Sequence, residues 1–567
     1  MLLPGRTAST LLAACRRALL IALATLLACS ATALPVRAET YEPITGSGST
    51  WSQNAIDQWR KNVKANYNMT VNFEGVGSSV GRTQFIANQV DFAISEIPFQ
   101  KTVAAGAQTS ERPEEGTYAY MPIVAGGTAF MYNLKINGKR VTNLRLSGQT
   151  ITKIFTGVIT KWNDPAIKAD NPGLVMPNRT ITPVVRADGS GTSAQFSMWM
   201  SKRHGALWNA FCAKVGWKTP CGLTSQYPAP AGFKAQNGSL GVAGYVSQSY
   251  GEGAITYVEY SYALKSGFPV AKVLNEAGYY VEPTASSVAV ALIKAEINPN
   301  PRSADYLTQI LDKVYANKDP RTYPLSSYSY MILPTKVRPG GTFTESKGKT
   351  LGAFGTYFLC EGQQQADQLG YSPLPMNLVL AGAEQIKRIP GVGNVAVNIN
   401  KCNNPTFKPG ESPSQNQLAK TAPQPRSCDK VGPTQCTTGT AGARQDTPVT
   451  TPTQGRSVDT STSDAGAGPA DGNASNEQVP QDQAVDPTAF DADGVPLSGS
   501  ARSSGTAVAS PFELASSEGW SSTQTLMAIA GVLVLGLVAG PPLLARRLRR
   551  SGAPSTTASR SGASGGQ

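Results

Sequence analysis

Apolar residues follow two different periods in the central part of the chain. Helical spacing predicts a helix over residues 51–63, whose apolar face is made of Trp51, Ala55, Ile56, Trp59 and Val63. Short apolar or β-branched runs predict strands at residues 70–73, 90–95 and 181–185. Further short helices are predicted around Phe85 and around Trp199. Strands and helices that alternate in this way indicate an α/β fold.

Turns rich in glycine and hydroxyl residues connect three of the predicted strands to helices. They cover residues 46–50, 75–79 and 189–193. A single turn of this kind is typical of a helix cap. Three at the carboxyl ends of strands favour convergence on one cleft, where helix N-termini offer unpaired N–H donors to an anion. Arg186 would add a bidentate donor to such an oxyanion site.

A carboxylate in the third turn, Asp188, refines the choice of anion. A carboxylate repels an anion unless that anion still carries a proton to donate. Hydrogenphosphate carries one at neutral pH and sulfate does not, so an acceptor left unpaired by sulfate would penalise it. The alternative is a purely structural role, in which Asp188 only orients Arg186.

The N-terminus has the features of a secretory signal, assigned to residues 1–38. Basic residues precede an apolar run over residues 18–28, which is too short to span a bilayer, and small residues follow, with cleavage expected after Ala33 or Ala38. The sequence before Cys29 faintly resembles a lipoprotein cleavage site, but the Leu before Ala28 is atypical of that motif. We therefore expect an exported protein.

The C-terminal part predicts a membrane anchor. A transmembrane helix is assigned to residues 523–545, because residues 526–545 carry no charge. The arginines that follow, in a basic tail at residues 546–567, predict a cytoplasmic C-terminus and an extracellular binding domain, single-pass in the cell membrane. Residues 405–522 are rich in Pro, Ser, Thr, Gly and Asp and predict a disordered tether.

Charge and cysteine usage exclude several classes of protein. The net charge is +13, but the basic residues are dispersed over the central region, so we expect no nucleic-acid binding. No C-x-x-C motif occurs and His204 is the only histidine, so no metal site is expected. Six cysteines remain after signal removal, which favours disulfides in an exported chain. Of fifteen possible pairings, sequence proximity favours Cys212–Cys221 and Cys428–Cys436, which leaves Cys360 with Cys402 as a preference.

The central three-fifths of the chain resembles the PstS family, the phosphate-binding proteins of ABC-type phosphate importers. The matching pieces occur in the family's order and are ITGSGSTW, FEGVGSSVGRTQFIANQVDFAISE, ITKIFTGVITKWNDPAI with NPGL, VVRADGSGTS and GAITYVEYSYA. The resemblance implies a two-lobed periplasmic-binding-protein fold (type II-like). The implied lobes are residues 39–123 with 263–404 for lobe I and residues 124–262 for lobe II, with crossings near residues 120–124 and 257–263.

The same resemblance implies the function and the site. It implies a monomeric receptor without cofactor or enzymatic activity that binds inorganic phosphate and hands it to an ABC permease. The implied phosphate-binding residues are Ser49, Thr50, Trp51, Ser78, Glu96, Arg186, Asp188, Ser190, Gly191 and Thr192.

Two of these positions depart from the family. Trp51 stands where Phe is usual, which should be tolerated if its backbone N–H is what binds. Glu96 stands where an Asp usually accepts the ligand's proton, so the carboxylate sits one methylene further out. The acceptor chemistry is kept, but the pocket must be rebuilt slightly or suit a slightly different oxyanion.

Two other function classes compete with the importer receptor. A surface module that scavenges or senses oxyanions without transport would also explain the tether and anchor. A phosphatase on the same scaffold is disfavoured, because Ser190 has no His nearby in sequence and G-x-S-x-G is not matched. Asn237-Gly238-Ser239 matches the glycosylation pattern, which we discount because the basic anchor tail looks bacterial.

Overall fold

The computed structural model describes residues 40–303, 305–393, 397–413, 415–440 and 443. The predicted signal (residues 1–38), the transmembrane segment (523–545) and the cytoplasmic tail (546–567) lie outside the described residues, as does most of the tether. Among the helices that the structure does describe, none combines the length and the apolar character required to cross a membrane.

One eight-stranded sheet runs through the protein. Its strands, in spatial order, are β2 (Val71–Glu74), β1 (Ile44–Gly48), β3 (Phe92–Ser95), β15 (Ser326–Pro334), β4 (Tyr118–Tyr132), β10 (Ala254–Glu259), β8 (Thr182–Arg186) and β9 (Lys234–Gln236). β1 pairs in parallel with β2 and β3, and β8 pairs in parallel with β9 and β10. Each parallel trio therefore brings the carboxyl ends of its strands to one edge.

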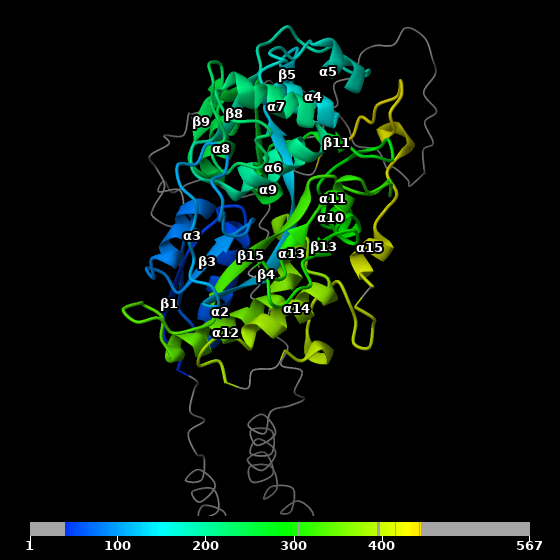
Figure 1. Cartoon of the computed structure of the whole chain (residues 1–567). Helices are drawn as coiled ribbons and strands as arrows, with labels where there is room; N and C mark the ends of the chain where they lie inside the picture. The colour runs from blue at the N-terminus through cyan, green and yellow to red at the C-terminus, as the bar shows by residue number, and fades with distance from the viewer. Residues whose placement is uncertain (1–39, 304, 394–396, 414, 441–442, 444–567) are drawn as a thin grey trace, which may run out of the picture. The chain divides into compact units, whose positions relative to one another are not determined.

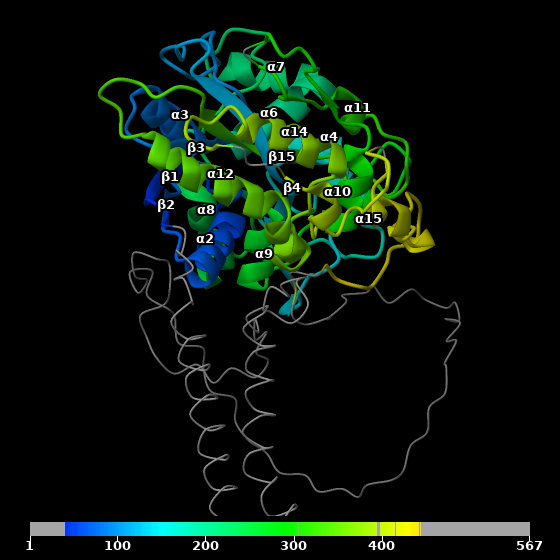
Figure 2. The same ribbon diagram turned by 90° about the horizontal axis from the view of Figure 1, so that it is seen from below.

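Helices pack around each parallel trio and define two lobes (Figure 1). Those of lobe I are α2 (Gln53–Tyr67), α3 (Ser78–Ile86), α10 (Ala285–Leu292), α12 (Glu345–Leu359), α13 (Ala366–Leu369) and α14 (Met376–Ile386). Those of lobe II are α4 (Gly148–Phe155), α5 (Pro165–Asp170), α6 (Gly191–Arg203), α7 (Gly205–Lys214) and α8 (Gly238–Ser247). In Figure 2, α12 lies beside β1 and α14 beside β4. The two-lobed α/β fold is thus as expected.

Shorter elements complete the described chain. The small strands are β5 (Lys135–Ile136), β6 (Lys139–Arg140), β7 (Arg145–Leu146), β11 (Lys272–Leu274), β12 (Tyr280–Val281), β13 (Glu296–Ile297) and β14 (Gln309–Ile310). The short helices are α9 (Tyr260–Ser266), α11 (Asp312–Tyr315) and α15 (Gln417–Thr421), with 3₁₀ turns at Ser249–Gly251, Glu361–Gln365, Ile399–Lys401 and Ser427–Asp429.

The predicted apolar face of the first helix is confirmed. Ala55, Ile56, Trp59 and Val63 of α2 are buried. The helix itself begins at Gln53, so Trp51 belongs to the preceding turn, where it is also fully buried. The apolar period therefore identified the core side of the helix, while its start depended on the geometry of the turn.

β4 is the first connection between the lobes. Its residues 118–127 pair with β15 in lobe I, and residues 128–132 pair with β10 in lobe II. The second connection is the end of β10 followed by α9. The chain then returns to lobe II, because β11 pairs with β7 and β12. The implied end of lobe II at residue 262 is therefore corrected to about residue 281, since this short sheet was not evident from the hydrophobic pattern.

The first part of the predicted tether packs on the folded domain. The buried Lys272 ammonium pairs with Asp429, 2.9 Å from Nζ to Oδ1, and the Arg145 guanidinium donates to the backbone carbonyls of Cys428 and Thr434. α15 packs against α10. The start of the tether is thus corrected from residue 405 to beyond residue 440. Composition missed this segment because it is held by a buried ion pair and by its own backbone carbonyls rather than by a large apolar face.

All three favoured disulfides are formed. Cys212 pairs with Cys221, Cys360 with Cys402 and Cys428 with Cys436. The third closes a small loop inside the segment that packs on lobe II, so it fixes that segment locally.

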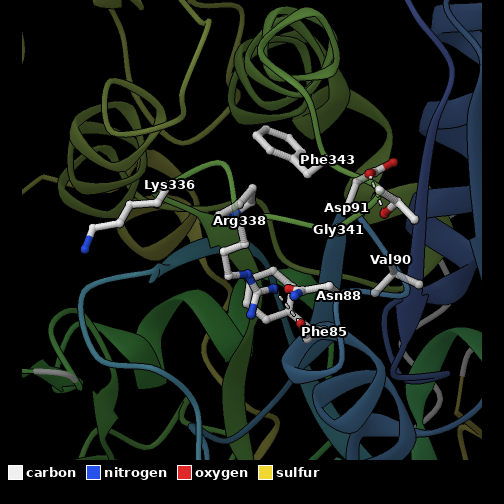
Figure 3. A pocket seen from close by; sticks show the side chains of 10 residues that line it. Phe85, Asn88, Val90, Asp91, Lys336, Arg338, Gly341 and Phe343 are labelled. Atoms are coloured by element: carbon white, nitrogen blue, oxygen red, sulfur yellow. Dashed lines mark hydrogen bonds between the residues drawn. The ribbon is translucent and has the colours of Figure 1, made fainter.

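A shallow hollow beside the end of α3 has a structural rather than a binding character (Figure 3). Its volume is about 10 Å³, which is room for about one water. Two of its charged groups are already engaged: Asp91 pairs with Lys347 at 3.1 Å, and Arg338 lies over the Phe85 ring and donates to the Phe85 carbonyl. The loop between β15 and α12 is held to lobe I by these contacts.

Candidate functional site

The strand-to-helix turns of both lobes meet at one place. β1 and β3 end at Gly48 and Ser95 in lobe I, and β8 ends at Arg186 in lobe II. Because β1 pairs in parallel with β3 in lobe I, and β8 with β10 in lobe II, the residues that follow these strands lie at the carboxyl edge of each half of the sheet. Helices α3 and α6 begin at Ser78 and Gly191, directly at this edge.

Lobe I contributes hydroxyls and one carboxylate. Ser49 and Thr50 follow β1, Ser78 opens α3, and Glu96 follows β3 directly. The Ser49 and Ser78 hydroxyls donate to Glu96 Oε2 over 2.7 and 2.9 Å. The Ser49, Thr50, Ser78 and Glu96 side chains are all buried. The segments after β1, β2 and β3 therefore bring these polar groups together in the buried interior, where water is excluded.

Lobe II contributes a guanidinium held by a carboxylate. Arg186 Nε donates to Asp188 Oδ1 over 2.7 Å, and Nη2 pairs with Asp188 Oδ2. Arg186 Nη1 lies 3.5 Å from Thr192 Oγ1 and 3.4 Å from Ser239 Oγ. The side chains of Arg186 and Asp188 are 2% and 13% exposed. The pair is bidentate, so the guanidinium plane is fixed and its remaining donor is aimed at the hydroxyls.

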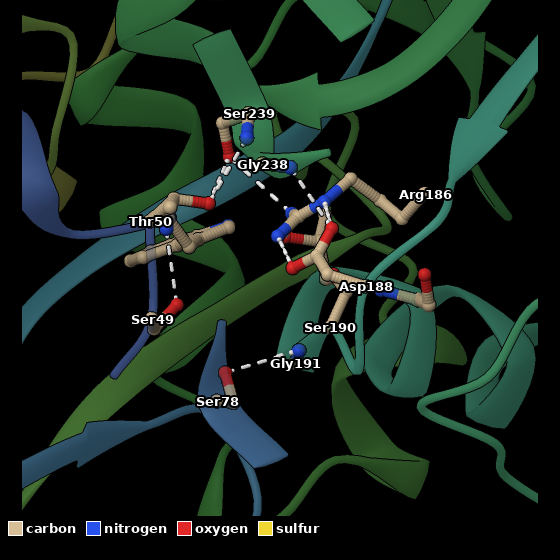
Figure 4. A network of polar contacts seen from close by, with 12 residues as sticks. Ser49, Thr50, Ser78, Arg186, Asp188, Ser190, Gly191, Gly238 and Ser239 are labelled. Carbon is tan, nitrogen blue, oxygen red and sulfur yellow. Dashed lines mark hydrogen bonds and ion pairs between the residues drawn. The ribbon is translucent and has the colours of Figure 1, made fainter. Parts of the chain in front are cut away.

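Hydrogen bonds at the site join the two lobes (Figure 4). The Gly191 N–H of α6 donates to Ser78 Oγ over 3.0 Å, and Thr50 Oγ1 accepts from the Ser239 N–H over 3.0 Å. Gly77 has φ +91°, and a Cβ there would lie 2.5 Å from Asp188 Oδ2. A side chain at Gly77 would therefore keep the lobes apart, which explains this glycine in the second turn.

Glu96 is the carboxylate that lobe I contributes to the site. Its side chain is fully buried, and this burial raises its pKa above the ordinary value. Hydrogen bonds from Ser329, Ser49 and Ser78 and the charge of Arg186 act in the opposite direction but do not outweigh the burial. The donor Ser329 comes from β15 and lies 2.7 Å from Oε1.

The structure brings most of the expected site residues together and turns the Trp51 indole away from the rest. Ser49, Ser78, Glu96 and Gly191 form one hydrogen-bonded group, and Thr50, Arg186, Asp188 and Thr192 form a second one through Ser239. The two groups adjoin because Ser49 precedes Thr50 and Gly191 precedes Thr192. The Trp51 N–H donates to Ser49 Oγ, but its indole packs edge-on against Tyr371. The Ser190 hydroxyl accepts from the Ser193 N–H and caps α6. Trp51 therefore offers the site only its backbone N–H. The Ser190 N–H donates to the Ser225 carbonyl over 2.9 Å, so only the hydroxyl proton of Ser190 is left for the site.

Three residues of the cluster were missed from the sequence. Gly238 and Ser239 open α8 after β9, and the Gly238 N–H donates to Asp188 Oδ1 over 2.9 Å. This is a fourth turn of the same Gly/Ser type, so its composition was an available signal, although the stretch was noted only as a match to the glycosylation pattern. Ser329 lies within a strand and has no turn signature. Only the pairing of β15 with β3 could have placed it.

The arrangement suits the capture of a small anion. It offers hydroxyl groups, backbone N–H groups at helix N-termini and one guanidinium, together with two carboxylate acceptors. His204 lies at the far end of α6 and packs edge-on against Trp199. Within the described part of the chain, no group of three or more His, Cys, Asp or Glu residues could hold a metal ion. The site therefore consists of donors and acceptors for a ligand.

Known proteins with related sequences were found. A family model described as a PBP superfamily domain matches residues 35–361. The phosphate-binding protein PstS of Xylella fastidiosa is 33% identical over 336 residues, which cover 59% of this chain and 82% of that protein. Phosphate-binding protein PstS 2 of Mycobacterium tuberculosis is 31% identical over 332 residues, covering 58% and 82%. The crystal structure of a phosphate-binding protein from Stenotrophomonas maltophilia aligns with a TM-score of 0.42 and 19% identity, covering 60% of this chain and 92% of that one.

Proposed function

Because this chain belongs to the PBP superfamily and, within it, to the PstS family of phosphate-binding proteins, we propose that it binds inorganic phosphate between its two lobes. One observation carries the proposal. The Arg186 guanidinium, the helix N-termini at Ser78 and Gly191 and the buried hydroxyls converge from both lobes on one place. Such a set of donors neutralises an oxyanion and excludes water from it.

The proposed ligands are the residues expected from the sequence. Hydroxyls of Ser49, Thr50, Ser78, Ser190 and Thr192, the Arg186 guanidinium and the backbone N–H groups of Trp51 and Gly191 would donate to phosphate oxygens. Asp188 would accept the proton that hydrogenphosphate still carries. The Glu96 carboxylate, expected from the sequence as a second acceptor, already accepts from Ser49, Ser78 and Ser329. Sulfate has no such proton at neutral pH, so each acceptor facing it would lose a partner in a dry site.

We further propose that the receptor is held at the outer face of the cell membrane and delivers phosphate to an ABC permease. The uncharged run at residues 526–545 and the arginines after it support the anchor. The polar sequence beyond residue 443 supports a tether that lets the binding domain reach the permease. Binding would then involve lobe closure and no chemical step.

Two experiments test these proposals separately. Full-length protein purified without added ligand would be denatured, and the released inorganic phosphate measured against an Arg186→Ala control. About one phosphate per wild-type chain and a much smaller amount per variant chain are expected. Absence of phosphate, followed by no binding of added phosphate, would reject the binding function. Phosphate uptake in a strain lacking the gene would test transport, and unchanged uptake would reject coupling to an importer.

A further inference from the structure

The Glu96 carboxylate lies deeper in the site than a simple acceptor of the ligand's proton needs to. Three hydroxyls donate to it: Ser49 and Ser78 to Oε2 over 2.7 and 2.9 Å, and Ser329 to Oε1 over 2.7 Å. The side chain is 0% exposed. Both carboxylate oxygens are thus already engaged by donors of the protein itself.

Oxygen Oε2 lies where all three Gly/Ser turns meet. Ser49 belongs to the first turn and Ser78 to the second. The third turn touches it as well, because a Cβ built on Gly191 would lie only 1.9 Å from Oε2. The same Ser78 hydroxyl accepts from the Gly191 N–H, so the donors of both lobes are aimed at one place. A carboxylate oxygen presents acceptor lone pairs to these donors in the same way as a phosphate oxygen does.

Chain length explains how Glu96 reaches this position. The residue follows β3 directly, and its backbone carbonyl is held by the side-chain amides of Gln195 and Gln309 over 2.7 and 3.1 Å. With the backbone fixed on both sides, the carboxylate position depends on the number of methylenes. An Asp at this position would end one methylene short of the point where Ser49 and Ser78 meet.

We propose that Glu96 is an internal competitor for phosphate: its carboxylate occupies donors of the oxyanion site, and phosphate binds by displacing it from Ser49 and Ser78. The inference rests on the proposed phosphate function and specifies its regulation. The competing form is the ionised one, because the carboxylate both accepts from the serines and repels the anion. The competition therefore weakens when Glu96 takes up a proton.

The surroundings determine the direction of the pH dependence. Burial raises the pKa of Glu96, while the hydroxyls and Arg186 lower it to a smaller extent. The charged or titratable groups on the elements packed around it are Arg186 and Asp188, which are paired with each other, Arg82, which is paired with Glu111, and Tyr330 on β15. As pH falls through the raised pKa of Glu96, the fraction of the competing carboxylate decreases. Phosphate affinity should rise accordingly, beyond any change due to phosphate's own titration.

Calorimetric titration of the full-length protein with inorganic phosphate tests the competition. Glu96→Asp keeps an acceptor and withdraws it from Ser49 and Ser78, so it should bind phosphate about tenfold more tightly at neutral pH, the equivalent of one charge-assisted hydrogen bond. Glu96→Gln removes the titration. The ratio of wild-type to Glu96→Gln dissociation constants should therefore fall as the pH of the titration is lowered through the raised pKa of Glu96, because phosphate's own protonation affects both proteins equally.

Ser329→Ala provides a second variant, whose substitution lies outside the three turns. It frees Oε1 without removing a proposed phosphate donor, so it should also tighten binding and should reduce the pH dependence. If Glu96→Asp shows no thermal unfolding transition and is therefore not folded, the phosphate affinity of Ser329→Ala tests the competition instead. Equal or weaker phosphate binding by Glu96→Asp, with a pH-independent wild-type to Glu96→Gln ratio, would overturn the competition while leaving the phosphate function intact. No phosphate binding by wild type and by all variants would overturn the phosphate function itself.

Discussion

Replacing Thr192 by Val removes one hydroxyl from the site and preserves the shape of the side chain. Thr192 is the second residue of α6 and is 1% exposed, so neither water nor a new rotamer can substitute for the lost group. Its Oγ1 lies 3.5 Å from Arg186 Nη1, which is at the limit of a hydrogen bond. The hydroxyl is therefore weakly used by the protein and is available to an anion.

The expected loss follows from the value of one hydrogen bond to a charged partner. Such a bond contributes about 1.5–3 kcal/mol, which corresponds to a roughly ten- to hundredfold weaker phosphate affinity for Thr192→Val. The dissociation constant would be measured by titration calorimetry on the full-length protein, alongside its thermal unfolding temperature. Unfolding should change little, because the substitution is close in volume and removes only a marginal contact.

The neighbouring residue offers a matched control. Ser193 lies in the same turn of α6, and its hydroxyl is bonded to the Tyr257 hydroxyl over 2.7 Å instead of facing the cluster. Ser193→Ala should therefore leave the phosphate dissociation constant within about twofold of wild type, since no hydrogen bond to the anion is lost. An unchanged phosphate affinity in Thr192→Val, or an equal loss of affinity in both variants, would refute the proposal that the third turn (residues 189–193) binds the anion.

Three further changes should have separable effects. Asp188→Ala leaves the buried Arg186 without its carboxylate and should reduce the free energy of unfolding by about 3 kcal/mol, with part of the loss recovered on adding phosphate; unaltered denaturant melts would contradict this. Burial raises the pKa of Glu259 well above its ordinary value, so wild-type stability should fall as pH rises above that ordinary value, and Glu259→Gln should become the more stable protein at the high end of a melting series; parallel pH curves would exclude this. Replacing both Cys360 and Cys402 by Ser opens a link across 42 residues and should cost about 4 kcal/mol in the chain-entropy account, a loss that denaturant titration under non-reducing conditions would detect or disprove.

Local chemistry predicted which polar residues lie close together better than it predicted the bounds of the lobes. The turns after β1, β2 and β8 were visible in the sequence because glycine, serine and threonine are typical of turns: glycine adopts positive φ, and the hydroxyls bond to nearby backbone groups. Parallel pairing brings the turns after β1 and β2 to the carboxyl edge of lobe I. Three antiparallel pairings lie between β3 and β10, so β8 runs in the opposite direction and its turn comes to the site from lobe II. The cluster around Arg186 and Asp188 could therefore be named before the fold was known.

The features that were missed depend on pairing between distant segments. Ser329 enters the site because β15 lies next to β3 in the sheet, and nothing in its own neighbourhood indicates this. The return of β11 to lobe II depends on two short strand pairings. Residues 405–440 are held by the Lys272–Asp429 pair and by carbonyls bound to Arg145, and composition says little about such contacts. Long-range polar contacts of this kind leave no period in the sequence.

Glu96 was visible in the sequence, but its role depends on contacts with distant segments. Its identity was visible as a departure from the family, but its consequence required the positions of Ser49, Ser78 and Gly191 around it. A substitution of one methylene changes which donors the carboxylate can reach, and that can be judged only when the backbone on both sides is placed.

The central claim is that the two lobes form a site for a protonated oxyanion, and the ratio of phosphate to sulfate affinity tests it most directly. Both anions would be titrated into the full-length protein by calorimetry at neutral pH and equal ionic strength. Phosphate should bind about a hundredfold more tightly or better, because sulfate leaves a buried carboxylate acceptor unpaired. Equal affinity for the two anions would contradict the account.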